Sequence, residues 1–540
     1  MINAKPTISE TSFDVIVIGA GINGAGIARD AAMRGLKVLL LDKGDMGGGT
    51  SAWSTRLIHG GLRYLEHGEF GLVRESLRER ERLIRIAPHL VRPMPLLIPI
   101  YEEARRGPWT MRAGMVAYDL LSFDKTLPRH RMLSRAEALQ QIDGLNPNGL
   151  VGAAVYYDGQ VEFAERLVVE NALSAVKHGA EVVTYARVDH FEIDHDQVRA
   201  VEFVRERTGE RETARASIVI NAGGPWVDQI LYQLQNGNAP DTARLIGGTK
   251  GSHIIVGPFP GAPTTAIYVE AQTDHRPFFI IPWNSKYLIG TTDIRYDGNL
   301  DDVIISSDEI EYLLRETNRV ILSASLDRDQ ILYSYSGVRP LPFAEDKDEQ
   351  SITRRHFIRQ HPKVENLFSI VGGKLTTYRS LAEEAADLIF DRLGRNSPKC
   401  NTDTLPLTGD AESDFETFRV RFNNDRRLSS LSAEHLLRTY GVAAESVVKL
   451  VDEDSRLVEV IDPETGAIAA EVVYAFRSEL AQTLTDCLMR RTMIGLNSTQ
   501  GLDAVKAAAR VAQNFLHWSN EEAVGETESY REYVNRRRLQ

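Results

Sequence analysis

The hydrophobic pattern at the start of the chain predicts a strand, a tight turn, a helix and a second strand. Residues 15–18 are apolar and β-branched without a polar interruption, as in a strand that is buried on both faces of a parallel sheet. A glycine-rich turn follows, and then a helical stretch with one small-residue face that ends at Gly35. A second apolar strand, residues 37–41, finishes on Asp42. This order predicts a β-α-β nucleotide-binding unit.

Three glycines in the turn fit the spacing G-x-G-x-x-G of dinucleotide-binding turns. Gly19 permits the tight turn, Gly21 lets the backbone approach a pyrophosphate, and Gly24 allows the helix to pack closely. The amides at the start of the helix would point at the diphosphate. The Asp42 carboxylate can accept hydrogen bonds from both ribose hydroxyls, which disfavours NADP. The glycines alone are a weak signal, because any strand–turn–helix can contain them, and the motif does not distinguish FAD from NAD.

The next segment is too rich in Gly, Ser and Thr to form a regular element, so we expect a loop that faces the ligand. Gly60 and Gly61 would let the backbone approach a flat, bulky group such as an isoalloxazine ring. His59 precedes them and is either a satisfied structural histidine or a catalytic group. Arg63 is either a solvated charge at the start of the following helix or an anion ligand. Loop hydroxyls are offered by Thr50, Ser51, Ser54 and Thr55.

The middle of the chain differs in composition from the N-terminal segment. Residues 91–149 are apolar, punctuated by proline and without a second nucleotide motif, so we assign them to a substrate-binding part. Within them, residues 105–118 form a basic and aromatic stretch that is either a membrane contact or a helix facing the core. Residues 165–177 have helical periodicity. Residues 181–188 have the composition of a strand, which we expect to return the chain to the nucleotide sheet.

Later segments return to the same two sheets. Residues 197–220 alternate like an antiparallel meander and end on a second glycine turn at 221–226. Residues 245–340 contain short strands rich in β-branched and aromatic residues, which we assign to the substrate-binding part. Residues 367–379 repeat the order of strand, Gly-Gly turn and helix start. From about residue 400 to 540 the apolar positions have helical spacing.

Composition narrows the class of protein. The 540 residues, 43% hydrophobic and 26% charged, suit an enzyme of two or three domains. The formal charge of -12 argues against a nucleic-acid partner. Cys400 and Cys487 are the only cysteines and are far apart, so we expect neither a disulfide framework nor a cysteine metal site, which suits a reducing cytosol. Residues 1–12 do not resemble a signal peptide, and no apolar run approaches the roughly 20 residues of a membrane span.

Five motifs in a fixed order resemble one family. They are TSAWSTRLIHGGLRYLE at 50–66, KGSHIIV at 250–256, GTTD at 290–293, YSGVRPL at 335–341 and VGGKLTTYR at 371–379. Together they are similar to the FAD-dependent glycerol-3-phosphate dehydrogenases of the D-amino-acid-oxidase-like flavoprotein superfamily, over essentially the whole chain. The second glycine turn resembles the return of these flavoproteins to their cofactor and favours FAD over NAD. Gly223 departs mildly from the usual Thr or Ala, so we expect only backbone contacts there.

The resemblance implies an α/β fold with three parts. They are a Rossmann-like FAD-binding domain of the glutathione-reductase or D-amino-acid-oxidase type, an antiparallel-sheet substrate domain, and a C-terminal helical domain. We expect the FAD-binding domain at 13–90, 150–228 and 335–395, the substrate domain at 91–149 and 229–334, and the helical domain at 400–540.

The resemblance also implies a reaction, the oxidation of sn-glycerol 3-phosphate to dihydroxyacetone phosphate by hydride transfer to flavin. Oxidising a secondary alcohol requires a base for the hydroxyl proton and cations for the substrate anion. His59 and His253 are both base candidates, and Arg339 is expected beside them at the reacting centre. The expected substrate ligands are Arg63, Tyr64, His253, Arg339 and Lys374. The expected cofactor ligands are Gly19, Gly21, Ile22, Asn23, Gly24, Asp42, Lys43, Thr50, Ser51, Ser54, Thr55, His59, Gly60, Gly61, Val188, Ala222, Gly223, Gly373, Lys374, Leu375 and Thr376.

By the same resemblance, electrons would then pass to a membrane quinone. We therefore expect a cytoplasmic protein that associates peripherally with the inner face of the cell membrane. The resemblance also implies a homodimer. The candidate membrane contact is the basic stretch named above. Its arginines would meet anionic headgroups while its large apolar residues enter the interface. The arginines are Arg105, Arg106 and Arg112, and the large apolar residues are Trp109, Met111 and Met115.

Two other functions remain open. An oxidase that passes electrons to oxygen would share the same motifs. A non-catalytic protein could use a flavoprotein-like fold to hold a partner, as prenyl-binding escorts do. The retained cofactor-facing glycines and the set of cations disfavour this second alternative.

Overall fold

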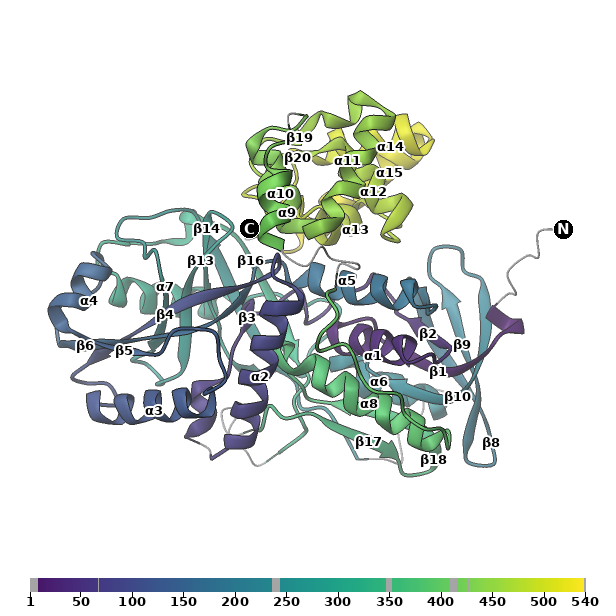
Figure 1. Ribbon diagram of the computed structural model, residues 1–540, viewed down its shortest axis with the longest axis horizontal. Helices are drawn as coiled ribbons and strands as arrows, with labels where there is room; N and C mark the ends of the chain where they lie inside the picture. Colours follow the sequence, from purple (N-terminus) through teal and green to yellow (C-terminus); the bar gives the residue numbers. More distant parts are fainter. Residues whose placement is uncertain are drawn as a thin grey trace.

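The computed structural model describes residues 8–66, 68–235, 243–345, 352–407, 415–425 and 427–538. Two large sheets lie side by side, and a helical unit sits above the junction between them (Figure 1). This arrangement confirms the predicted α/β class with a C-terminal helical domain.

The first sheet carries the nucleotide-binding unit. Strand β1 (Ser12–Ile18) lies in its middle and pairs in parallel with β2 (Val38–Leu41) and β10 (Arg211–Asn221). Helix α1 (Ile22–Met33) follows β1 and contacts α5 (Ala164–Lys177) and α8 (Tyr378–Arg392). The remaining strands of this sheet are β7 (Glu181–Val183), β8 (Ala186–Asp194), β9 (Gln197–Arg205), β17 (Phe357–His361) and β18 (Val364–Val371). The predicted β-α-β unit is therefore confirmed, and its strands are buried as their apolar runs require.

The second sheet is mixed and mainly antiparallel, and it builds the opposite half of the molecule (Figure 1). Its strands are β3 (Leu57–Ile58), β4 (Val91–Tyr101), β5 (Arg131–Ser134), β6 (Leu150–Val161), β11 (Thr249–Val256), β12 (Ala266–Glu270), β13 (Pro277–Trp283), β14 (Lys286–Gly290), β15 (Ile294–Arg295) and β16 (Ile331–Arg339). Its accompanying helices are α2 (Phe70–Ile86), α3 (Pro108–Leu121), α4 (Arg135–Gln141) and α7 (Ser307–Val320). A buried cluster of Leu, Ile, Val and Phe from these strands and from α7 forms a core of its own.

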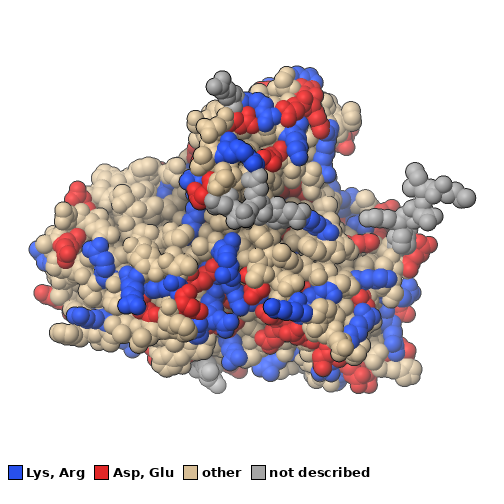
Figure 2. All heavy atoms as spheres, in the orientation of Figure 1, with Lys and Arg blue, Asp and Glu red and all other residues tan. Residues whose placement is uncertain are grey.

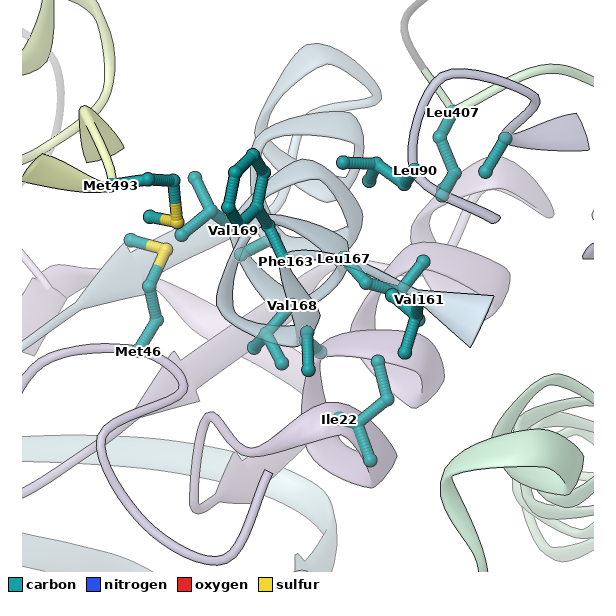
Figure 3. Close-up of a cluster of buried hydrophobic side chains, with 14 of the residues drawn as sticks. Ile22, Met46, Leu90, Val161, Phe163, Leu167, Val168, Val169, Leu407 and Met493 are labelled. Atoms are coloured by element: carbon teal, nitrogen blue, oxygen red, sulfur yellow. The ribbon is translucent and has the colours of Figure 1, made fainter. Parts of the chain in front are cut away.

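The C-terminal unit is mostly helical, as predicted, but it also contains a short two-stranded sheet, β19 (Val460–Asp462) with β20 (Ala467–Ile468). Its helices are α9 (Phe415–Phe422), α10 (Ser430–Tyr440), α11 (Ala444–Glu453), α12 (Ala469–Ser478), α13 (Leu484–Asp486), a π-helical turn (Cys487–Arg491), α14 (Val505–Leu516) and α15 (Asn520–Asn535). Its apolar side chains join the same buried cluster as α1 and α5. Figure 3 shows part of this shared core, with Met493 of the helical unit beside Phe163 and Val169.

The structure corrects two expectations about the strands. Residues 150–161, expected in the FAD-binding part, form β6 and pair with β4 in the second sheet. β16 pairs with β11 in that sheet, as expected for the strands of 245–340, although the boundary at residue 335 had divided it. An apolar strand carries no local signal of which sheet it will join. The single strand expected at 181–188 is interrupted, because Tyr185 has a left-handed backbone with φ of 56°.

Candidate active site

One cavity of about 1040 Å³ runs along the carboxyl edge of the first sheet and into the second. We call it the cofactor cavity. The turn after β1, the loop after Asp42, the turn after β10 and the Gly-Gly turn after β18 all face it. The expected residues that line it are Gly19, Gly21, Ile22, Asn23, Asp42, Lys43, Thr50, Ser51, Ser54, Thr55, His59, Tyr64, Val188, Ala222, Gly223, His253, Arg339, Gly373, Lys374, Leu375 and Thr376. The fold thus brings together segments that are far apart in the sequence.

The turn between β1 and α1 has the geometry that a dinucleotide requires. Gly19 has φ of 103°, and a Cβ at Gly24 would lie only 1.8 Å from the Gly19 carbonyl oxygen, so neither position admits a side chain. Gly21 caps α1 without a side-chain hydrogen bond. Asn23 Oδ1 is buried and has no hydrogen-bond partner among the described residues. An open helix N-terminus beside an unsatisfied polar atom suits the phosphate and ribityl groups of FAD.

The Asp42 carboxylate fixes the turn while it faces the cavity. Its Oδ2 accepts a hydrogen bond from the Ala20 amide at 2.6 Å, and its Oδ1 accepts one from the Gly44 amide at 2.8 Å. Each oxygen keeps a second lone pair, which a ribose hydroxyl could use. Burial raises the pKa of Asp42, although the two amides act against that shift.

Hydrogen bonds to the surrounding segments hold the hydroxyl-rich loop in place. Ser51 Oγ accepts a hydrogen bond from the Ile22 amide at 3.0 Å, and Thr50 Oγ1 donates one to the Val338 carbonyl at 2.6 Å. Thr376 Oγ1 accepts a hydrogen bond from the His59 amide at 3.1 Å. These hydroxyls therefore orient the loop and the Gly-Gly turn relative to one another.

Two guanidinium groups share one carboxylate at the far end of the cavity. Asp293 Oδ1 lies 3.0 Å from Arg339 Nη1, and Asp293 Oδ2 lies 3.1 Å from Arg354 Nη2. Burial would raise the pKa of Asp293, but the two arginines outweigh it and the pKa is lowered. Burial and the neighbouring Arg354 lower the pKa of Arg339, with Asp293 opposing them. The shared carboxylate leaves one net positive charge, which an anionic ligand would balance.

The sequence analysis missed Arg354 and Gly251 as parts of this end of the cavity. Arg354 belongs to an Arg-Arg pair that carries no local sign of a site. A Cβ at Gly251 would lie 2.3 Å from Arg339 Nη2, so glycine is required there for the guanidinium to keep its place. A glycine inside a predicted strand was the available signal, because such a residue often marks a close approach.

Lys374 and His59 lie in the same end of the cavity. Lys374 Nζ donates a hydrogen bond to Ser76 Oγ at 2.9 Å and lies 4.6 Å from the centre of the Tyr64 ring. Burial lowers the pKa of Lys374 to about 7, with Asp158 the largest opposing charge. Burial and the charge of Lys374 lower the pKa of His59 to about 3. His59 is therefore neutral at physiological pH, with one ring nitrogen that carries no proton.

His253 lies deeper in the protein. It is 1% exposed and lies within β11. Its Nε2 is hydrogen-bonded to Thr55 Oγ1 at 3.0 Å, and its ring packs against Tyr335. Burial, together with Arg339 and Arg56, lowers the pKa of His253.

Four expected site residues do not line the cavity: Gly24, Gly60, Gly61 and Arg63. Gly24 allows helix α1 to pack closely on the turn, because a Cβ there would lie 1.8 Å from the Gly19 carbonyl oxygen. The Gly60 amide donates hydrogen bonds inward, to Tyr118 Oη at 3.0 Å and to Asp158 Oδ1 at 3.2 Å. Arg63 is half-buried, and its pKa is lowered chiefly by burial, with Arg354 among the neighbouring charges.

Comparisons with known proteins agree with this geometry. Residues 14–438 match the model of the FAD dependent oxidoreductase family, and residues 400–523 match the C-terminal domain of alpha-glycerophosphate oxidase. A glycerol-3-phosphate dehydrogenase from Synechocystis is 48% identical over 98% of this chain and 97% of its own length. An aerobic glycerol-3-phosphate dehydrogenase from Staphylococcus saprophyticus is 33% identical over 90% of this chain and 88% of its own.

Among solved structures, the glycerol-3-phosphate dehydrogenase from Bacillus halodurans complexed with FAD has a TM-score of 0.80 and 27% sequence identity. The match covers 98% of this chain and 96% of that one, so it includes the C-terminal helical unit. The cofactor cavity, its glycine turns and these relatives lead to one conclusion: the chain belongs to the FAD-dependent oxidoreductases and, within them, to the glycerol-3-phosphate dehydrogenase family.

Proposed function

We propose that this protein oxidises sn-glycerol 3-phosphate to dihydroxyacetone phosphate. One observation carries the proposal: Arg339, Arg354 and Lys374 converge in the same cavity as a neutral histidine and the dinucleotide turn. Guanidinium forks and an ammonium group are the side chains that hold a phosphoryl group. The names of the relatives support the same substrate.

Each residue has a definite part in this reaction. Bound FAD would supply the acceptor for the hydride of the carbinol carbon. Arg339 and Arg354 hold the phosphate, and because Asp293 fixes both guanidinium groups beforehand, little of their motion is lost on binding. Lys374 adds a third positive charge. All three side chains are half-buried, so water screens their charges less than at an open surface, and their attachment to different elements would orient the phosphate relative to the hydroxyl that reacts.

We assign the base to His59 and not to His253. The His59 ring is half-buried in the cavity, whereas His253 is 1% exposed and its Nε2 is engaged by Thr55. A neutral imidazole at His59 can take the hydroxyl proton as the hydride leaves. The dianionic substrate opposes the charge of Lys374 and so raises the pKa of His59 when the base has to act.

A spectrum tests the reaction directly. The purified holoenzyme is titrated with glycerol 3-phosphate without oxygen, and bleaching of the flavin absorbance is expected, whereas glycerol at equal concentration should leave the spectrum nearly unchanged. A colourless protein would support the non-catalytic alternative. Bleaching by both compounds alike would place the phosphate site elsewhere. Stoichiometric peroxide after admission of air would favour the oxidase.

We further propose that electrons pass to a membrane quinone and that the enzyme, a homodimer by resemblance, works at the membrane surface. No helix in the described part of the chain has the length and apolar composition that a bilayer span requires. Acidic and basic side chains are interspersed on the face drawn in Figure 2, so charge alone does not define a lipid-binding region there. We infer that exposed apolar side chains provide the contact.

Helix α3 supplies such side chains, in a pattern that differs from the expected one. Met111 and Met115 are buried against the core and cannot enter a membrane, and Arg106 pairs with Glu66 and Glu270. On the opposite face of the helix, Trp109 is 81% exposed and Leu120 is 69% exposed. They lie on one stripe with Val116, and Phe123 follows the helix, 78% exposed. Large exposed apolar residues on one helical face fit an interfacial contact.

A further inference from the structure

The loop between Asp42 and Ser51 has both ends at the cofactor turn. The Asp42 carboxylate accepts a hydrogen bond from the Ala20 amide, and the Ser51 hydroxyl accepts one from the Ile22 amide at the start of α1. Between them, the Gly47 amide donates to the Ala20 carbonyl at 2.9 Å. The shape of this loop therefore sets the positions of two expected FAD ligands.

The middle of this loop is held by the C-terminal helical unit. Asp45 is buried, and both oxygens of its carboxylate accept hydrogen bonds from Arg491, at 2.8 Å each. Arg490 Nε donates to Asp45 Oδ2 at 2.5 Å, and Arg490 Nη2 donates to Asp486 Oδ1 at 2.8 Å. The two carboxylates and two guanidinium groups balance in charge, so the group can be buried without a residual charge. We call these four residues the Asp45 clamp.

Apolar packing and a second hydrogen bond reinforce the clamp. Figure 3 shows Met46 of the loop and Met493 of the helical unit pointing toward one another in the shared core. Tyr185, whose amide donates to the Gly44 carbonyl, also donates its hydroxyl hydrogen to Asp486 Oδ1 at 2.6 Å. The helical unit thus holds the loop from several sides.

The helical unit also forms a wall of the cofactor cavity. Arg490 lines the cavity, whereas Arg491 lies behind it and is fully buried. Other lining residues from this unit include Thr483, Glu526, Ser529, Tyr533 and Arg537. A unit whose task was only to pack on the back of the fold would not present polar side chains to the cavity.

We propose that the C-terminal helical unit is a working part of the FAD site, and that Arg490 is the positioning residue through which it acts. Arg491 alone satisfies both oxygens of Asp45, so the second arginine is not needed to neutralise that carboxylate. Arg490 instead ties the loop to Asp486 at the cavity wall. Four buried charges cost more desolvation than apolar packing would, and precise placement of a binding loop is the gain that offsets this cost.

The test measures FAD affinity and not turnover, so its result is independent of the proposed substrate. The holoenzyme and its Arg490→Gln variant are diluted, and released FAD is followed by its fluorescence. Melting temperatures are measured with FAD removed and with FAD in excess. We expect the dissociation constant for FAD to rise about tenfold, the loss expected for a charge-assisted hydrogen bond. The melting temperature of the FAD-free protein should change less than the increment that FAD adds.

A matched control is Lys286→Gln, which breaks another contact of the helical unit, the 2.6 Å pair between Lys286 and Glu464 outside the cavity. It should lower both melting temperatures equally and leave FAD affinity within about twofold. Arg490→Lys keeps the positive charge and replaces Arg490→Gln as the test if the latter does not fold. Its dissociation constant for FAD should lie between those of the wild type and Arg490→Gln. Unchanged FAD affinity in the folded Arg490 variants, or an equal loss in Lys286→Gln, would overturn the proposal.

Discussion

Asp293 holds Arg339 before any ligand arrives, with Oδ1 3.0 Å from Nη1. Because the same carboxylate also holds Arg354, the two guanidinium groups form a preorganised pair. Lysine cannot reproduce this geometry, because its ammonium group makes no planar, bidentate contact.

Replacing either arginine by lysine should therefore lower kcat/KM for glycerol 3-phosphate by about tenfold to a hundredfold, the lower range for a broken buried charge contact. The flavin spectrum should be unchanged, because neither residue belongs to the nucleotide turn. Steady-state kinetics of Arg339→Lys and Arg354→Lys measure this loss. Arg328→Lys, at an exposed pair with Glu311, is the control and should match wild type. Wild-type kinetics in both variants would remove the phosphate assignment.

The activity should decrease above neutral pH because of Lys374. Its pKa is lowered to about 7 by burial, so the fraction that carries a positive charge falls as the pH rises through that value. Substrate binding needs the cation, and kcat/KM should therefore decline on the alkaline side. Arginine stays charged at every accessible pH. In Lys374→Arg the decline of kcat/KM should disappear, even if the absolute rate is lower. The same decline at alkaline pH in both proteins would contradict the assignment.

Asp42→Ala should weaken FAD binding by roughly 1 to 3 kcal/mol, the range for losing a charge-assisted hydrogen bond. The loss includes the ribose contact and the two backbone amides that Asp42 accepts in the free cavity. Fluorescence titration of released flavin measures it. Asp297→Ala is the matched control, since Asp297 is an exposed carboxylate that pairs with Arg244 and does not line the cavity. Equal flavin retention in Asp42→Ala and wild type would refute the role of Asp42.

Tyr118→Phe should destabilise the protein by about 1 to 3 kcal/mol, because the buried Asp158 carboxylate and the Gly60 amide each lose a hydrogen-bond partner. Arg80 still faces Asp158 at 2.7 Å, so the charge remains paired and the fold should persist. Urea unfolding gives the free energy. Tyr312→Phe removes a comparable hydrogen bond to the exposed Asp274 and should cost less. A smaller loss at Tyr118 than at Tyr312 is not compatible with the described network.

Membrane binding should depend on the outer face of α3. Trp109→Glu combined with Leu120→Glu should abolish sedimentation with anionic vesicles while dye-linked turnover is kept, because both side chains point away from the core. Val524→Glu, at a residue that is 60% exposed on α15, is the control and should still bind. If the double variant still binds vesicles, α3 is not the membrane contact and its role is structural.

The sequence by itself determined the nucleotide-binding unit. Residues 12–42 fold as predicted because their signals are local: an apolar run for the strand, glycine for the φ of 103° at Gly19, and helical spacing for α1. The resemblance to the flavoprotein family, and not the local pattern around each residue, led to the expectation that His59, Arg339 and Lys374 lie near one another, and all three line the cofactor cavity.

The tertiary structure alone decided how distant charges meet. Arg354 and Arg339 share a carboxylate, and Arg490 reaches Asp45 although 445 positions separate them in the chain. Which sheet β6 would join was also open, because an apolar strand can pair with any exposed edge. Ion pairs and strand pairing depend on distance in space and leave no periodic mark in the sequence. These features therefore became visible only when the chain was folded.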